Sequence, residues 1–267
     1  MIRAMRFLPL ALLTVLLLAA CAGEQESQTR TSASVVQVGT DATYPPFESI
    51  NPATNQPAGF DVDLIKEISR LNDWQIEFVI TPFDKIVDGL KAGDFDIIIS
   101  AMTITQKRAA LVDFSDAYFT AGQSIAVPLE DSSISGAQDL TGKKVGVQLG
   151  TTGEMMAQDM EGLHVYSYDN IGQAFDDLAA GNLDVVLNDF PTTKALVQQL
   201  GTAKIVGEIM SEEQYGLAVR KGDTEKLQKI NQALKEIKDS GRFDSIYTRW
   251  FGSPPSRPVT ADSVGSP

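Results

Sequence analysis

The sequence is nearly without cysteine and histidine. Among its 267 residues there is one cysteine, Cys21, and one histidine, His164. One residue of each kind is too few for a disulfide or for a zinc site built from these ligands, so we expect no metal site. His164 lies in a predicted strand, where a packed or surface role is more typical than that of a catalytic base. Motifs for cofactors are equally scarce, because Gly150-Thr-Thr-Gly153 lacks the lysine and the spacing of a P-loop, and we expect no cofactor.

Positive charge is also in short supply. The chain has 22 Lys and Arg against 35 Asp and Glu, a formal net charge of −13. An acidic surface of this kind argues against nucleic acid as a partner and against electrostatic adhesion to anionic lipid. The rest of the composition, 43% hydrophobic and 21% charged, is that of an ordinary globular protein, and the length suits one large or two medium domains.

No long apolar run is available near the N-terminus to span a bilayer comfortably. Arg3 and Arg6 precede an apolar run at 7–20, which is short and flanked as a secretory signal is. The run ends in Leu-Ala-Ala followed by Cys21, which resembles a bacterial lipoprotein cleavage site. We therefore predict a signal peptide at 1–20, a lipidated Cys21 and a flexible tether at 21–34; a buried core cysteine is the alternative reading of Cys21.

The middle of the chain alternates strands with helices. Apolar runs such as 35–39 and 95–99 predict buried strands, and helical spacing after Asp61, a plausible helix cap, predicts the first helix. The alternation indicates an α/β fold with mainly parallel sheets. Residues 90–100 and 178–188 repeat one pattern of helix, Gly turn and buried strand ending in a polar residue, which suggests two similar lobes that present strand ends to one cleft.

Polar residues follow the strand at 95–99. Ser100, Ala101, Thr103 and then Arg108 come where an open α/β sheet places its ligands, and hydroxyls, backbone N–H groups and a guanidinium would suit a small carboxylate. The turn that begins at Gly150 would add free N–H groups at the start of a helix. A strand followed by a capped helix, with Arg108 on a solvated face, explains the same residues.

Three further positions are ambiguous in the same way. Asp189 either binds a ligand or caps the helix that begins near Pro191. Tyr44 and Phe83 follow strand ends, where an aromatic residue is usually part of the core; two of them at neighbouring strand ends would also clamp a flat or cationic group.

Taken together, these motifs resemble the extracytoplasmic solute-binding proteins of ABC importers, in particular the group that binds polar amino acids. The resemblance covers residues 35–252 in the family's order. It rests on the following stretches: Gly39-Thr-Asp-Ala-Thr-Tyr-Pro-Pro-Phe-Glu48, Gly59-Phe-Asp-Val-Asp-Leu64, Asp96-Ile-Ile-Ile-Ser100, Met102-Thr-Ile-Thr-Gln-Lys-Arg108, Phe114-Ser-Asp116, Gly146-Val-Gln-Leu-Gly-Thr-Thr-Gly153, Asn188-Asp189, Gln214-Tyr-Gly216 and Tyr247-Thr-Arg-Trp-Phe251.

The resemblance implies a two-lobed periplasmic-binding-protein fold that closes on a free amino acid, with two strands crossing between the lobes. The boundaries it implies are lobe 1 at 35–117 and 216–252, lobe 2 at 123–210, connecting segments at 118–122 and 211–215, and a disordered tail at 253–267. By similarity, the site residues are Arg108, Thr103, Ala101 and Thr152 for the α-carboxylate, Asp189 and Ser100 for the α-amine, Tyr44 and Phe83 around the side chain, and Asp41, Gln148 and Thr151 at its far end.

Charge balance predicts the ligand. Arg108 and Asp189 neutralise the two ends of a zwitterion, which leaves Asp41 facing Gln148, where a glutamine-specific relative has a lysine. A buried carboxylate without a partner is costly, so we expect a cationic amino acid, arginine or lysine. The alternatives are glutamine or a broad range of polar amino acids, or a lyase on the same fold that resembles cyclohexadienyl dehydratase. We expect a monomeric binding protein, not an enzyme, lipid-anchored outside the cytoplasm and serving the membrane permease of an ABC importer.

Overall fold

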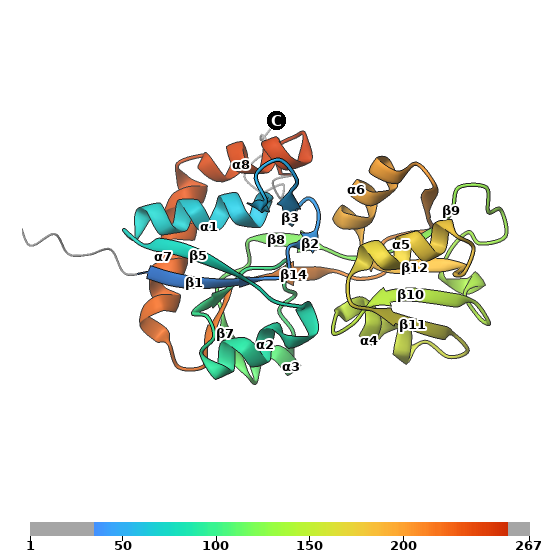
Figure 1. The fold of residues 1–267 in the computed structure, drawn as a ribbon, viewed down its shortest axis with the longest axis horizontal. Coiled ribbons are helices and arrows are strands. Elements are labelled where there is room, and N and C mark those ends of the chain that lie inside the picture. Colours follow the sequence, from blue (N-terminus) through green and yellow to red (C-terminus); the bar gives the residue numbers. More distant parts are fainter. Residues whose placement is uncertain (1–34, 256–267) are drawn as a thin grey trace, which may run out of the picture. The chain divides into compact units, whose positions relative to one another are not determined.

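The computed structural model describes residues 35–255, all of which lie within one compact unit of the chain. The predicted signal peptide, Cys21, the tether and most of the tail lie outside the described residues. Two five-stranded sheets organise the described part, and each is flanked by helices to form a lobe (Figure 1).

The first sheet has the strand order β5-β1-β6-β15-β7. Strand β1 runs parallel to β5 and β6, whereas β15 runs antiparallel to β6 and β7. A small three-stranded sheet, β2-β3-β4, follows β1. The elements of this lobe are β1 (Val35–Thr40), β2 (Thr43–Tyr44), β3 (Glu48–Asn51), β4 (Gln56–Ala58), α1 (Phe60–Leu71), β5 (Gln75–Ile80), α2 (Phe83–Ala92), β6 (Ile97–Ile98), α3 (Gln106–Ala109), β7 (Val112–Phe114), β15 (Ala218–Arg220), α7 (Thr224–Asp239) and α8 (Arg242–Phe251).

The second sheet has the order β11-β10-β12-β9-β13. Strand β10 is parallel to β11 and β12, and β9 is antiparallel to β12 and β13. Its elements are β9 (Gln123–Pro128), the short 3-10 helix η1 (Ala137–Asp139), β10 (Lys144–Gln148), α4 (Thr152–Asp159), β11 (His164–Tyr168), α5 (Ile171–Ala179), β12 (Val185–Asp189), α6 (Phe190–Leu200) and β13 (Ala203–Val206).

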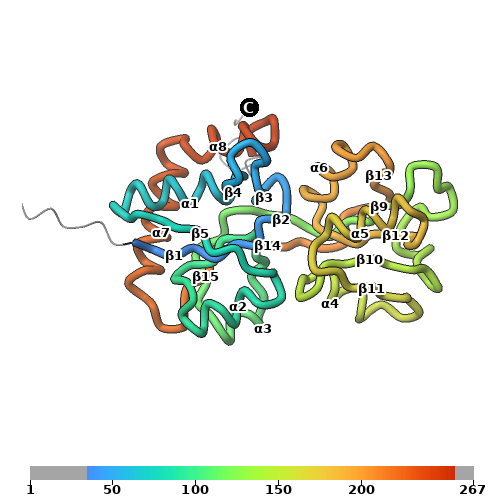
Figure 2. Tube along the Cα trace, in the orientation of Figure 1, coloured from blue at the N-terminus to red at the C-terminus, as the bar shows by residue number. Residues whose placement is uncertain are grey.

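Two antiparallel strands that pair with each other, β8 (Phe119–Ala121) and β14 (Glu213–Tyr215), lie where the chain passes between the lobes (Figure 1 and Figure 2). Tyr215 of β14 also forms an isolated antiparallel bridge with Thr103. The two strands lie within the two segments predicted to join the lobes; that the lobes turn about them stays a prediction. The chain is tightly packed here, because a Cβ added to Gly122 would lie 2.1 Å from the carbonyl oxygen of Ser211. Glycine is therefore required where the two connections pass each other.

The sheets are mixed, so the expectation of mainly parallel sheets is only partly right. Strand β9 follows β8, and β15 follows β14. Both strands therefore enter their sheets from the connecting segments and run opposite to β12 and β6. The antiparallel direction of β9 and β15 is set by the way the chain enters each sheet after it crosses between the lobes. The hydrophobic pattern of the sequence does not reveal this direction. The strand predicted at 95–99 is also shorter than expected, since only Ile97–Ile98 form ladder pairs.

Candidate functional site

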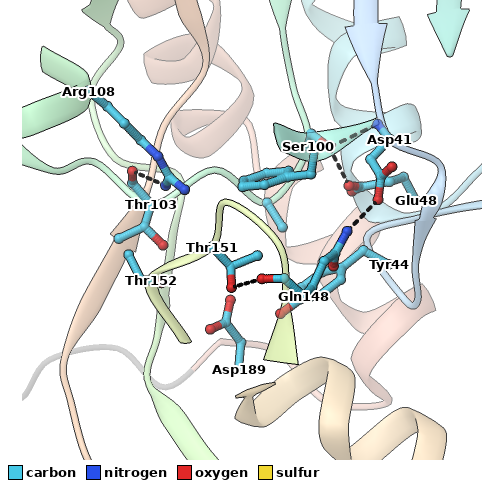
Figure 3. A pocket seen from close by; sticks show the side chains of 12 residues that line it. Asp41, Tyr44, Glu48, Ser100, Thr103, Arg108, Gln148, Thr151, Thr152 and Asp189 are labelled. Carbon is cyan, nitrogen blue, oxygen red and sulfur yellow. Dashed lines mark hydrogen bonds between the residues drawn. The ribbon is translucent and has the colours of Figure 1, made fainter. Parts of the chain in front are cut away.

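One pocket gathers every residue that was predicted to bind a ligand. The eleven predicted residues line this pocket together with Glu48 (Figure 3). The lining is Asp41, Tyr44, Glu48, Phe83, Ser100, Ala101, Thr103, Arg108, Gln148, Thr151, Thr152 and Asp189. The structure thus brings together residues from both lobes, while the role of each toward a ligand remains a prediction.

The ends of four strands explain why these residues meet. Asp41 follows β1 and Ser100 follows β6 in the first sheet; Gln148 ends β10 and Asp189 ends β12 in the second. Strands that run in parallel deliver their carboxyl ends to one edge of a sheet, and here the corresponding edges of two sheets face each other across the pocket. The two repeated patterns in the sequence end at Ser100 and Asn188, next to this site.

Arg108 is a buried cation, so the alternative of a solvated arginine is wrong. It lies in α3, whose cap Thr105 accepts a hydrogen bond from the Arg108 backbone N–H at 3.2 Å, and it is 7% exposed. Its guanidinium donates to the carbonyl oxygens of Thr103 at 2.8 Å and Gly150 at 3.1 Å and lies over the Phe83 ring, 5.1 Å from the centroid.

Among the described residues 35–255, the Arg108 guanidinium contacts carbonyl oxygens and an aromatic face, with no carboxylate in ion-pair contact. Burial lowers the pKa of Arg108, and the nearby charges of Asp189 and Glu213 act in the opposite direction. A buried guanidinium without a paired anion is able to bind a carboxylate, because its planar fork matches two oxygens.

Asp189 occupies the cap position of α6 but does not act as a cap. Its side chain makes no capping bond, and its two carboxylate oxygens accept hydrogen bonds from the Tyr215 hydroxyl and from Nε2 of Gln123. Burial, followed by the negative charge of Glu213, raises the pKa of Asp189 to about 7. A desolvated carboxylate of this kind favours a cation as its neighbour.

Asp41 faces Gln148, as the sequence predicted. Nε2 of Gln148 donates to Oδ2 of Asp41 at 3.0 Å, the Thr43 hydroxyl donates to the same oxygen, and the Asp41 backbone N–H donates to the Ser100 hydroxyl oxygen at 3.0 Å. Burial raises the pKa of Asp41, and the bonds from Thr43 and Gln148 reduce the shift. The carboxylate is thus hydrogen-bonded by neutral groups, and the pocket lining places no lysine beside it.

Glu48 lines the pocket and was not predicted. It is fully buried, and its Oε1 accepts a 2.7 Å hydrogen bond from the Ser100 hydroxyl. Burial and the charge of Asp61 raise the pKa of Glu48 well above its usual range. Glu48 ends a stretch that resembles the family, but the local sequence does not show that its side chain contacts Ser100.

Asp61 is not the cap of α1; the expectation was wrong. The cap position is Gly59, and Asp61 lies inside the helix, where its Oδ2 accepts the Ala101 backbone N–H at 2.7 Å and the Tyr118 hydroxyl at 2.9 Å. The buried carboxylate therefore holds the turn after β6 instead of the helix start. The N–H of Ala101 is thus used within the protein and is not available to a ligand carboxylate.

The three threonines of the pocket are all hydrogen-bonded within the protein. Thr151 caps α4 by accepting the Glu154 backbone N–H at 3.2 Å, and its hydroxyl donates to the Gln148 carbonyl at 2.7 Å. The hydroxyls of Thr103 and Thr152 both donate to Oε2 of Glu213, each at 2.7 Å. Glu213 was not predicted either, although it directly precedes the Gln214-Tyr-Gly216 motif.

Metal ligands do not cluster in the described part of the chain. Within residues 35–255, no group of three or more His, Cys, Asp or Glu side chains is arranged to hold a metal ion. None of the helices described there is both long and apolar enough to cross a bilayer.

Comparison with known proteins extends the resemblance. Residues 36–253 match the model of the bacterial extracellular solute-binding proteins, family 3. A probable histidine-binding protein of Neisseria gonorrhoeae is 33% identical, with 89% of this chain and 92% of that protein covered. A putative ABC transporter arginine-binding protein 2 of Escherichia coli K12 is 34% identical, with 84% and 94% covered. The solved structure of an ancestral arginine-binding protein bound to arginine has a TM-score of 0.80 and 45% identity, over 82% of this chain and 99% of that one.

Proposed function

The chain belongs to the bacterial extracellular solute-binding proteins of family 3, and from this premise we propose that it is the receptor of an ABC amino-acid importer whose ligand is arginine or lysine. The relatives named above bind amino acids and are binding proteins, not enzymes. The receptor class is common to them, whereas the choice of ligand differs among them. That choice has to be argued from the pocket of this chain.

The observation that carries the proposal is the charge of the pocket lining. Among its twelve residues, Arg108 is the one cation, while Asp41, Glu48 and Asp189 are carboxylic acids. A zwitterionic amino acid adds one carboxylate for Arg108 and one ammonium for Asp189. Asp41, 5% exposed and bonded to neutral donors, is then left for the ligand side chain. A cationic side chain pairs with it, and an acidic one would place two carboxylates together.

The aromatic residues support the same ligand class. Phe83 already stacks with a guanidinium, that of Arg108, and Tyr44 borders the same pocket at 7% exposure. An aromatic face attracts a guanidinium and also covers the methylene stem of a lysine. We therefore propose that Tyr44 and Phe83 enclose the ligand side chain between them.

A thermal-shift panel of the twenty amino acids, run on protein stripped of ligand by unfolding and refolding, tests the proposal. A ligand that binds only the native state raises the melting temperature according to its affinity. We expect arginine and lysine to give the largest shifts, histidine and glutamine smaller ones, and glutamate none. A larger shift from glutamine or from an acidic amino acid would overturn the assignment of a cationic ligand.

Glutamine is the second candidate, and one observation favours it. Nε2 of Gln148 and the carboxylate of Asp41 together offer a donor and an acceptor to a ligand amide, and the ancestral arginine-binding protein has also been solved bound to glutamine, at 45% identity and a TM-score of 0.79. Titration calorimetry with arginine, lysine and glutamine ranks the three directly. Recovery of each ligand unaltered after incubation would separate a receptor from a lyase.

The place of action follows from the family, which is extracellular or periplasmic. We further propose that lipid on Cys21 anchors the protein to the membrane, near the permease that it serves. Mass spectrometry of the mature N-terminus tests this, with Cys21→Ser as the variant. We expect the variant to appear in the soluble fraction with unchanged ligand affinity; a variant that stays with the membrane would contradict the anchor.

A further inference from the structure

Glu213 is a buried carboxylate on the connecting strand β14, outside the set of residues that line the pocket. It is 8% exposed and accepts four hydrogen bonds. Oε2 accepts from the hydroxyls of Thr103 and Thr152, each at 2.7 Å; Oε1 accepts from Nε2 of Gln123 at 3.0 Å and from the Ser211 hydroxyl at 2.9 Å.

The donors come from different parts of the molecule. Thr103 follows β6 of the first lobe, Thr152 begins α4 of the second lobe, and Gln123 begins β9 of the second lobe. One oxygen of Glu213 therefore binds a hydroxyl from each lobe. Both bonds exist together only when the lobes have the relative placement seen in this structure.

The chemistry of these bonds fixes the direction of two hydroxyl protons. In both contacts the threonine hydroxyl is the donor and Oε2 of Glu213 is the acceptor, as suits a carboxylate, which only accepts hydrogen bonds. A hydroxyl has one proton and two lone pairs, and the protons of Thr103 and Thr152 are used by Glu213. The Thr152 oxygen also accepts from Nε2 of Gln123 at 3.3 Å, which leaves it one lone pair. Toward the pocket, both hydroxyl oxygens are then acceptors, which suits an ammonium and does not suit a carboxylate.

We propose that Glu213 is a positioning residue of the amino-acid site: it orients the Thr103 and Thr152 hydroxyls from the two lobes as acceptors for the ligand's α-ammonium, and so couples ammonium recognition to lobe closure. The α-carboxylate is left to Arg108 and to the first backbone N–H groups of α4, which have no partner within their own helix. The inference rests on the proposed function only in that the ligand is a free amino acid.

Asp189 connects Glu213 to the rest of the ammonium subsite. Nε2 of Gln123 donates to both carboxylates, and the charge of Glu213 contributes to the raised pKa of Asp189. The other groups that face Asp189 are the hydroxyls of Tyr215 and Tyr44 and the charge of Arg108. An ammonium placed among Asp189, Thr103 and Thr152 would relieve the repulsion between the two carboxylates.

The test compares an amino acid with its des-amino analogue, for example arginine with 5-guanidinopentanoic acid. The variant is Glu213→Gln, which keeps the shape but adds a donor facing the threonines; the matched control is Glu212→Gln, its exposed neighbour on the chain. We expect Glu213→Gln to reduce the preference for the amine-bearing ligand by about tenfold or more, and Glu212→Gln to leave it unchanged. Equal affinity ratios in Glu213→Gln and wild type would overturn the proposal.

Two readouts separate positioning from a purely structural role. In a double-mutant cycle, Thr103→Val should cost less affinity in the Glu213→Gln background than in wild type, because the two residues act through one bond; multiplicative losses contradict this. The pH midpoint of amino-acid binding should also fall in Glu213→Gln, since Asp189 loses a neighbouring negative charge. A midpoint that stays in place would contradict the coupling.

If Glu213→Gln does not fold, the test is the affinity of Thr103→Val for the amino acid and for its des-amino analogue. This substitution should weaken binding of the amino acid and leave the des-amino analogue unaffected; equal losses for both ligands would overturn the proposal. If wild type binds a neutral amino acid in place of arginine, the same comparisons are made with that amino acid and its own analogue. The role of Glu213 and the charge of the ligand side chain are thus decided separately.

Discussion

The hydroxyl of Tyr44, in the first lobe, donates a 2.6 Å hydrogen bond to Oδ1 of Asn188 in the second. Two further hydrogen bonds cross the pocket in the same way, from Gln148 to Asp41 and from Arg108 to the carbonyl of Gly150. The structure thus has the lobes closed on each other by contacts made within the protein. Closure is favoured by these bonds and by whatever a ligand adds to both lobes at once.

Tyr44→Phe should remove the hydrogen bond to Asn188 while keeping the aromatic ring. A neutral hydrogen bond contributes about 0.5–1.5 kcal/mol, so we expect ligand affinity to fall by roughly 2- to 10-fold, mainly through faster dissociation. Stopped-flow measurement of ligand release checks this. The control is Tyr168→Phe, which removes a 2.6 Å bond to Asp177 within the second lobe and should leave the release rate alone. Identical release from wild type and Tyr44→Phe would show that the bond plays no part in closure.

Arg108→Ala should abolish amino-acid binding and leave the fold intact. The guanidinium is held by carbonyl oxygens, so its loss removes the partner of the ligand carboxylate and not the partner of a protein carboxylate. Loss of one partner of a buried charge pair costs roughly 3–5 kcal/mol, a drop of at least about two decades in affinity. Calorimetry and circular dichroism measure the two effects, with Lys107→Ala, its exposed neighbour, as the control. Binding as in wild type would refute the placement of the carboxylate.

Asp41→Asn should change which amino acid is preferred. A hydrogen bond to a charged group is worth about 1.5–3 kcal/mol, so we expect arginine and lysine to bind about 10- to 100-fold more weakly, while glutamine loses little. Asp88→Asn is the control, since that side chain is 76% exposed on α2. Competition titration of the three amino acids gives the ratios. If the affinities for arginine and glutamine fell by the same factor, Asp41 would not be the residue that discriminates between ligand side chains.

The stability of the ligand-free protein should fall as the pH rises from 5 to 8. Burial raises the pKa of Asp61 to about 6 and that of Asp189 to about 7, and it raises the pKa of Asp41 and Glu48 as well. A carboxyl with a raised pKa in the folded state contributes stability that is fully present below its unfolded pKa and is lost as the pH passes the folded value. We expect a higher melting temperature at pH 5 than at pH 8 without ligand; the opposite order would contradict these shifts.

Ligand affinity should have the opposite pH dependence. In the proposed site the α-ammonium pairs with the ionised form of Asp189, whose pKa of about 7 means that binding below neutral pH releases a proton. The affinity should therefore rise with pH, by up to about tenfold per unit below pH 7, and level off above it. Calorimetry in buffers of different ionisation enthalpy measures both the affinity and the proton release. An affinity that is the same at pH 5.5 and pH 8 would exclude this linkage.

The sequence by itself determined the fold class and, apart from Glu48, indicated the residues that line the pocket. Hydrophobic period and turn residues predict strands and helices locally, and the ends of strands are where an α/β protein places a ligand. Together with the family motifs, these signals point to Asp41, Ser100, Gln148 and Asp189 as site residues. The repeated pattern at 90–100 and 178–188 indicated two lobes for the same reason. These are properties of short stretches, and they hold without knowledge of what packs against them.

The tertiary structure alone decided the hydrogen-bond partners. Asp61 and Asp189 both have the chemistry of helix caps, and both instead accept bonds from residues that are far away in sequence, Tyr118 and Tyr215. Glu213 is 110 residues from Thr103 along the chain, yet the two side chains meet once β8 and β14 pair. A buried polar group takes whichever partner the fold brings near, because leaving it without one costs more than any local preference gains.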